Sequence, residues 1–129
     1  MDATPEDELY TYILIRQDLH MPAGKMSSQA IHAARLSMLI YLRDNPSRAE
    51  EFIRLNTCGS AVTLLARNLG DLERARTEAN AAGLPCALFA DSGHIMPPSF
   101  SGELIVTALA IGPAPRAVMR AITKRFRCA

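Results

Sequence analysis

The sequence predicts an α/β fold, a three-layer α/β/α single domain with a four-stranded mixed β-sheet. Its 129 residues, 49% of them hydrophobic, are enough for one buried core. Short apolar runs alternate with segments of helical periodicity in the order β-α-α-β-α-β-β-α. Because helices connect the first three strands, we expect these to be parallel, and we expect the last two strands to pair antiparallel.

The first half of the chain supplies one strand and two helices. Residues 9–16 are rich in β-branched and aromatic side chains, which is typical of a buried strand. A long helix is expected over residues 25–42. Asn45 and Pro46 should end it and begin a second helix over residues 47–55, as a capping residue followed by proline at the first helical position. Residues 1–8 are acidic and are expected to form a flexible lead-in.

The second half adds three strands and two helices. The predicted strands are residues 60–66, 86–90 and 104–111. Residues 70–71 should cap a helix that ends at Gly83, a residue type favoured just beyond a helix C-terminus. Residues 112–115 contain two prolines and are expected to begin the last helix.

The charge is distributed unevenly, although the net charge is only +1. No acidic residue follows Glu103, and the final segment carries five cations: Arg116, Arg120, Lys124, Arg125 and Arg127. This basic helix could contact phosphates. It could equally be a solvated face whose cations lie favourably near the helix C-terminus.

The cysteines and the hydropathy limit the class of protein. The sequence has three cysteines but no CxxC pair, no signal peptide and no membrane-length apolar run. These features predict a reduced, cytoplasmic protein. No cysteine and histidine pair has the spacing of a zinc site, so we expect no metal. Cys58 and Cys86 are weak candidates for a thiol nucleophile, because neither has a histidine nearby in sequence.

Lys25 is the first candidate site residue. A cation in the first turn of a helix opposes the helix dipole, which costs a few tenths of a kcal/mol unless an anion compensates. Gln29 and His32 follow at helical spacing and place three polar side chains on one stripe. The stripe continues as Leu36, Leu39 and Ile40, which predicts that the helix packs on the core with its polar start at the rim.

Two acids follow predicted strands that should end at the same rim. Asp18 follows the first strand and Asp91 the third, and ligands of open α/β sheets gather beyond the carboxyl ends of parallel strands. A lysine beside a carboxylate can bind phosphate, orient the carboxylate or polarise a carbonyl, while Asp91 could activate water and Gln29 position it. Asp91, followed by Ser92 and Gly93, could instead simply form a turn.

The histidines allow two interpretations each. His32 is expected to pack and to bond a backbone carbonyl, rather than to shuttle protons. His20 and His94 lie in loops at the same rim, where they could approach phosphates or be ordinary loop residues.

Several motifs resemble one known family. Eight residues of the first motif have its spacing: Asp18, Leu19, Met21, Gly24, Lys25, Gln29, His32 and Ala33. The run that begins at Thr107 and ends at Pro113, the Gly-Leu turn at residues 83–84 and the loop at residues 91–93 also match. The chain therefore resembles the type II peptidyl-tRNA hydrolases over nearly its whole length, and the resemblance implies their fold.

The resemblance implies an enzyme that hydrolyses the ester between a peptide and the 3′ end of tRNA, without metal or cofactor. It implies Lys25 and Asp91 as the central catalytic pair, with Gln29 in support; Lys25 would stabilise the oxyanion and Asp91 would activate water. The expected substrate-binding residues are Asp18, His20, Gly24, His32, His94 and Thr107. The resemblance implies tRNA as the partner and no association with a membrane. The sequence does not decide whether the chain forms a homodimer.

The chain departs from the family pattern after Asp91. His94 and Ile95 replace an arginine and a threonine, and the loop that leads to the last strand is longer. Fewer cations precede Lys25, which weakens the expected capture of tRNA phosphates. The alternatives are a catalytically silent paralogue that binds tRNA or a protein partner, and a small hydrolase of another acyl substrate.

Overall fold

The computed structural model describes residues 8–92, 95–96, 100–101 and 103–129. Residues 1–7 of the expected lead-in lie outside this part of the chain. The helices are α1 (Ala23–Asp44), α2 (Arg48–Leu55), α3 (Leu69–Ala81) and α4 (Arg116–Thr123), with a short 3-10 turn η1 (Gln17–Leu19). The strands are β1 (Leu9–Arg16), β2 (Ser60–Ala66), β3 (Cys86–Asp91), β4 (Ile95–Met96), β5 (Phe100–Ser101), β6 (Ile105–Pro115) and β7 (Arg127–Cys128).

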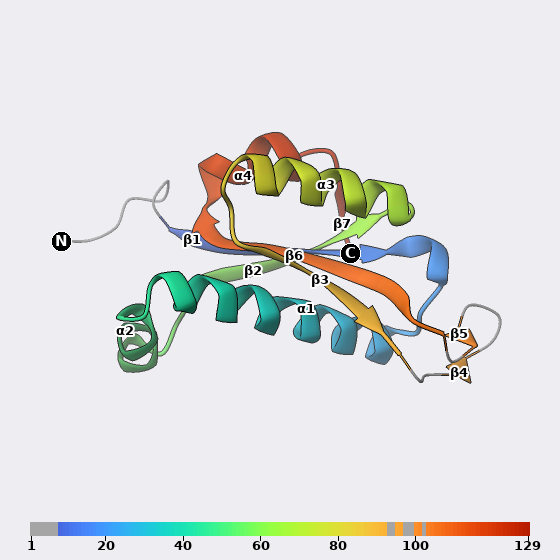
Figure 1. Cartoon of the computed structure of the whole chain (residues 1–129), viewed down its shortest axis with the longest axis horizontal. Coiled ribbons are helices and arrows are strands. Elements are labelled where there is room, and N and C mark those ends of the chain that lie inside the picture. Colours follow the sequence, from blue (N-terminus) through green and yellow to red (C-terminus); the bar gives the residue numbers. More distant parts are fainter. Residues whose placement is uncertain (1–7, 93–94, 97–99, 102) are drawn as a thin grey trace.

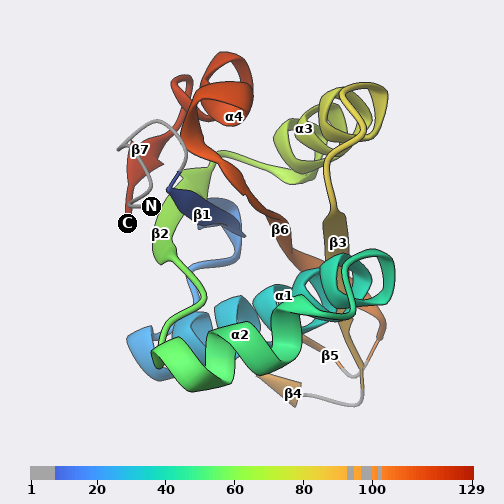
Figure 2. The ribbon, with the colours of Figure 1, turned by 90° about the vertical axis from the view of Figure 1, so that its left-hand side faces the viewer.

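Five of these strands form one mixed sheet in the order β3-β6-β1-β2-β7. Helices α1 and α2 lie on one side of it, and α3 and α4 lie on the other (Figure 1). Figure 2, turned by 90°, shows the same two helical layers above and below the strands. Strands β4 and β5 pair with each other, apart from the main sheet. The three-layer α/β prediction is therefore confirmed, whereas the predicted count of four strands is wrong.

The strand directions agree with the prediction, but the strand order adds a detail. β1 and β2 are parallel neighbours. β6 pairs antiparallel with both β1 and β3, so β3 runs in the same direction as β1 but is separated from it by β6. The missed fifth strand, β7, has only two residues, too few for a periodic signal, and it pairs with the outer edge of β2.

The capping residues at the starts of α2 and α3 differ from the prediction. Asn45 does not cap α2; its side chain donates to the Tyr41 carbonyl at the end of α1. The cap of α3 is Asn68, whose side-chain oxygen accepts from the Asp71 amide at 3.0 Å, rather than residues 70–71. Both asparagines lie in the chain just outside the helix, where their short amides reach backbone groups that the helix leaves unbonded.

Strand β6 continues where the sequence predicted the last helix. Its pairing with β1 shifts between Tyr10 and Tyr12, so that Gly112 and Pro113 together lie opposite Thr11. This bulge accommodates a proline inside a central strand, because the residue in a bulge leaves the regular ladder. Gly112 has φ +118°, and a Cβ there would collide with the Tyr10 carbonyl oxygen.

Gly112→Ala is therefore expected to destabilise the fold by at least about 1–3 kcal/mol, the usual cost of a side chain in a strained backbone region. Denaturant unfolding measures this loss. Gly24→Ala is the matched control, because no atom lies within 4 Å of a Cβ at Gly24 in α1. Alanine is the better helix former, so the control should be neutral or more stable. Equal losses in both variants would contradict the close approach at Gly112.

Helix α1 packs on the sheet through small residues. Its buried positions are Gln29, Ala33 and Ser37. Ala33 meets Ala108 and Ala110 of β6 in one core cluster, and the Ser37 hydroxyl donates to the Gly112 carbonyl. The prediction that Leu36 and Leu39 face the core is wrong: their exposed fractions are 41% and 64%. Small side chains let the helix approach β6 closely, which brings its first turn within reach of β3.

Candidate active site

The two charged side chains at the start of α1 and the end of β3 meet directly. Lys25 Nζ donates to Asp91 Oδ2 at 2.8 Å. The exposed fractions of the two side chains are 7% and 17%, so the ion pair is mostly removed from water. The Asp91 carboxylate thus supplies the anion that a lysine in a first helical turn needs. Coulomb interactions are stronger here than at an open surface, because less water screens them.

Gln29 lies one turn beyond Lys25 and connects Asp91 to β6. Its Nε2 donates to Asp91 Oδ2 at 3.5 Å, and its Oε1 accepts a hydrogen bond from Thr107 Oγ1 at 2.5 Å. Gln29 is 3% exposed and Thr107 is fully buried. Because the threonine hydroxyl occupies the amide oxygen, the amide nitrogen has to face the carboxylate. Four predicted site residues from three elements are therefore in one hydrogen-bonded group.

Asp18, His20 and Gly24 lie on the neighbouring turn and at the start of α1, beside this hydrogen-bonded group. Asp18 accepts two hydrogen bonds from the Arg16 guanidinium, at 2.7 and 3.1 Å. His20 is exposed in a left-handed conformation, and its backbone N–H donates to the carbonyl of Gln17, the first residue of η1. Gly24 is exposed. Their predicted substrate-binding roles stay predictions.

Arg16 is a residue that the sequence reasoning missed. Besides holding Asp18, it donates from Nη1 to the Val106 carbonyl of β6 at 3.0 Å. It therefore ties the end of β1 and the following turn to the strand that carries Thr107. An arginine at the end of a strand, two residues before an acid, was the available signal.

His32 packs as the sequence predicted, but with a different partner. Its ring stacks on Phe89 of β3 with 4.5 Å between centroids. Its Nδ1 lies 2.9 Å from the Arg35 guanidinium, not at a backbone carbonyl. Since a guanidinium only donates, Nδ1 accepts this bond. Lys25, Gln29 and His32 all face β3, as their helical spacing indicates.

The remaining candidates lie elsewhere. His94 is outside the described residues. The Cys86 thiol donates to Asn80 Oδ1 at 3.2 Å, and burial raises its pKa, so it is poorly suited to act as a nucleophile. Cys58 is exposed in the turn before β2. Among the described residues, no helix is both long and apolar enough to span a membrane.

Comparison with known proteins agrees with this arrangement. The family model "Peptidyl-tRNA hydrolase PTH2" matches residues 9–129. The chain belongs to the peptidyl-tRNA hydrolase PTH2 family. The match extends from the start of β1 past the end of β7, so it includes all four residues of the hydrogen-bonded group.

Relatives in eukaryotes and archaea carry the same name. A probable peptidyl-tRNA hydrolase 2 of Dictyostelium discoideum is 32% identical over 89% of this chain and 52% of its own length. The peptidyl-tRNA hydrolase of Methanocaldococcus jannaschii is 35% identical over 78% and 83% of the two chains, and that of Methanococcus vannielii is 32% identical over 89% and 94%. The chain spans about half the length of the Dictyostelium relative and of the one from Saccharomyces cerevisiae (56%).

Thr107→Val is expected to lower kcat about tenfold, because valine keeps the volume and removes the hydroxyl that fixes Gln29. It should also cost about 1–3 kcal/mol of stability, since the buried Gln29 oxygen loses its donor. Steady-state kinetics and thermal unfolding measure the two effects. Thr107→Ser keeps the hydroxyl and should retain most of the activity. Wild-type activity in the valine variant would contradict the positioning role.

Proposed function

We propose that this chain hydrolyses the ester bond between a peptide and the 3′ ribose of tRNA. The supporting observation is the mostly buried ion pair of Lys25 and Asp91, held by Gln29 and Thr107 at one edge of the sheet. Family membership gives the substrate class, because the family model and its archaeal relatives carry the name peptidyl-tRNA hydrolase.

In this proposal Asp91 acts on the attacking water and Lys25 acts on the oxygen of the reacting carbonyl. A water molecule adds to the ester carbon while its proton passes to the Asp91 carboxylate. The Lys25 ammonium stabilises the negative charge that forms on the carbonyl oxygen. The tetrahedral intermediate then expels the 3′ oxygen of the ribose, which takes the proton from Asp91. The products are a peptide carboxylic acid and tRNA with a free 3′ hydroxyl.

The proposed reaction uses no thiol, because the hydrogen-bonded group consists of Lys25, Gln29, Asp91 and Thr107. Cys86 is engaged with Asn80. All three cysteines are free thiols, which supports the proposed cytoplasmic location, where disulfides are rare. A homodimer stays a prediction, and no step of this mechanism requires one.

The test is cleavage of a labelled peptidyl-tRNA by the purified chain. We expect release of the peptide together with a free tRNA 3′ end, at a rate proportional to enzyme concentration. Binding of the substrate without release of peptide would contradict the proposal and favour a silent tRNA-binding paralogue. Absence of both binding and cleavage would favour a hydrolase of another acyl substrate.

A further inference from the structure

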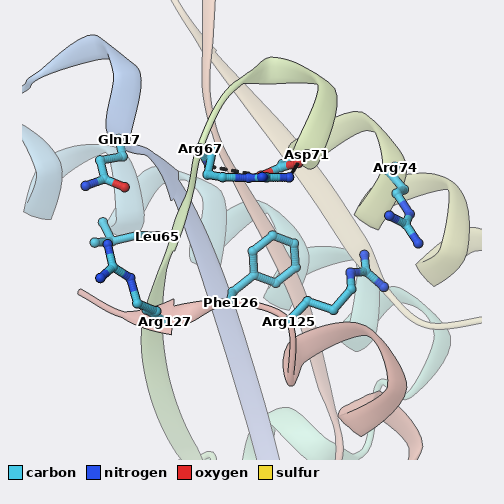
Figure 3. Close-up of a pocket in the computed structure, with 8 residues that line it drawn as sticks. All are labelled: Gln17, Leu65, Arg67, Asp71, Arg74, Arg125, Phe126 and Arg127. Atoms are coloured by element: carbon cyan, nitrogen blue, oxygen red, sulfur yellow. Dashed lines mark hydrogen bonds and ion pairs between the residues drawn. The ribbon is translucent and has the colours of Figure 1, made fainter.

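A hollow lined by arginines, about 490 Å³ in volume, lies beside β2 and β7. We call it the arginine hollow; its lining residues are Gln17, Leu65, Arg67, Asp71, Arg74, Arg125, Phe126 and Arg127. Figure 3 shows the four arginines arranged around the Phe126 ring and coming from different parts of the chain. They derive from the β2–α3 turn, from α3, from the turn after α4 and from β7.

The arginine hollow has excess positive charge. Two carboxylates contact its guanidiniums: Asp71 pairs with Arg67 at 3.0 Å, and Glu78 pairs with both Arg74 and Arg125 at 3.1 and 2.8 Å. Hydrogen bonds from the arginines lower the pKa of Asp71 and of Glu78, so both are ionised at neutral pH. Four guanidiniums thus share two carboxylates, and two positive charges remain in excess among these residues.

The position of the arginine hollow follows from strand register. One row across the sheet joins five residues in order, Phe89, Ala108, Ile15, Leu65 and Arg127. Asp91 lies two residues beyond Phe89, at the opposite edge from Arg127. Four strand spacings separate these edges, which is about 19 Å at about 4.8 Å per spacing. The two sites therefore lie at the same end of the sheet but on its two outer strands. Helix α3 and the turn after α4 lie on the face opposite α1, so the path between the sites over the surface is longer than this in-sheet distance (Figure 1).

We propose that the arginine hollow binds backbone phosphates of the tRNA whose 3′ ester reacts at Lys25 and Asp91; this rests on the proposed function. Guanidinium forks fit phosphate oxygens in a bidentate manner. A separation of at least about 19 Å corresponds to five or more stacked nucleotides at about 3.4 Å each, which a tRNA end spans and a single nucleotide does not. The Arg67 and Arg74 side chains are 82% and 70% exposed, so both guanidiniums can reach a phosphate from the solvent side.

The experiment measures binding of deacylated tRNA to the full chain as a function of salt concentration. Arg74→Gln/Arg127→Gln is the variant, because Arg74 is 70% exposed and Arg127 lies in the exposed strand β7, so the fold should persist. We expect about tenfold weaker binding and a salt slope smaller by about one or two, reflecting one or two lost phosphate contacts. Arg43→Gln is the matched control, since Arg43 lies about 27 Å from Lys25 along α1 at 1.5 Å per residue.

Three results would overturn the proposal: unchanged tRNA binding in the double variant, an equal loss in Arg43→Gln, or displacement of tRNA by millimolar inorganic phosphate at constant ionic strength. The last would identify a small free anion as the ligand. Cleavage by the wild-type chain of a peptide esterified to a CCA trinucleotide tests the proposed function separately, because that substrate is too short to reach the hollow. Failure of hydrolysis and failure of phosphate binding are therefore distinguished.

Discussion

Lys25→Met is expected to lower kcat for peptidyl-tRNA about 100- to 1,000-fold, the usual loss when one group that stabilises an oxyanion is removed. Methionine keeps the length and apolar stem of lysine but removes the charge 2.8 Å from Asp91. Steady-state hydrolysis of labelled peptidyl-tRNA measures the loss. Arg43→Met is the control, because Arg43 is 71% exposed near the far end of α1, and its kcat should equal that of the wild type.

The same substitution should also destabilise the fold by about 3 kcal/mol, because it leaves a mostly buried carboxylate without its cation. Adding Asp91→Asn removes that charge, so the double variant should recover much of the stability without recovering activity. Thermal unfolding of both variants separates the two effects. Recovery of activity along with stability would mean that Lys25 serves only the fold.

Asp91→Asn alone is expected to lower kcat about 100- to 10,000-fold, the range for loss of a general base. Asparagine has nearly the same shape, so contact with Gln29 is retained while the proton acceptor is lost. Hydrolysis at saturating substrate measures the effect. Asp44→Asn, at the exposed end of α1, is the control and should have wild-type kcat. Unchanged turnover in Asp91→Asn would exclude its role as the base.

The convergence of Lys25 and Asp91 was predictable because it follows from strand direction. Two acids that follow strands of the same direction must lie at the same end of the sheet, and α1 begins at that end. The sequence did not predict that β6 separates β1 from β3. The hydrogen-bonded group of Lys25, Gln29 and Asp91 therefore also includes a residue of β6. This residue is Thr107, whose hydroxyl orients Gln29.

Other features were not predictable because competing effects outweigh the local pattern. Leu36 and Leu39 continue an apolar stripe, yet the helix packs through Ala33 and Ser37, since small side chains permit the close approach to β6. Pro113 is typical of a helix start, but a bulge opposite Thr11 keeps it within the strand. The arginine hollow combines residues from four separate segments and has no signal in any one of them.

The most direct test of the account is a double-mutant cycle on the rate of a single turnover of bound peptidyl-tRNA. The four proteins are the wild type, Lys25→Met, Asp91→Asn and the double variant. If the two side chains act as one unit, the double variant should react no more slowly than the slower single variant. Losses that multiply, or a single variant that retains the wild-type rate, would contradict the joint action of Lys25 and Asp91 on the ester.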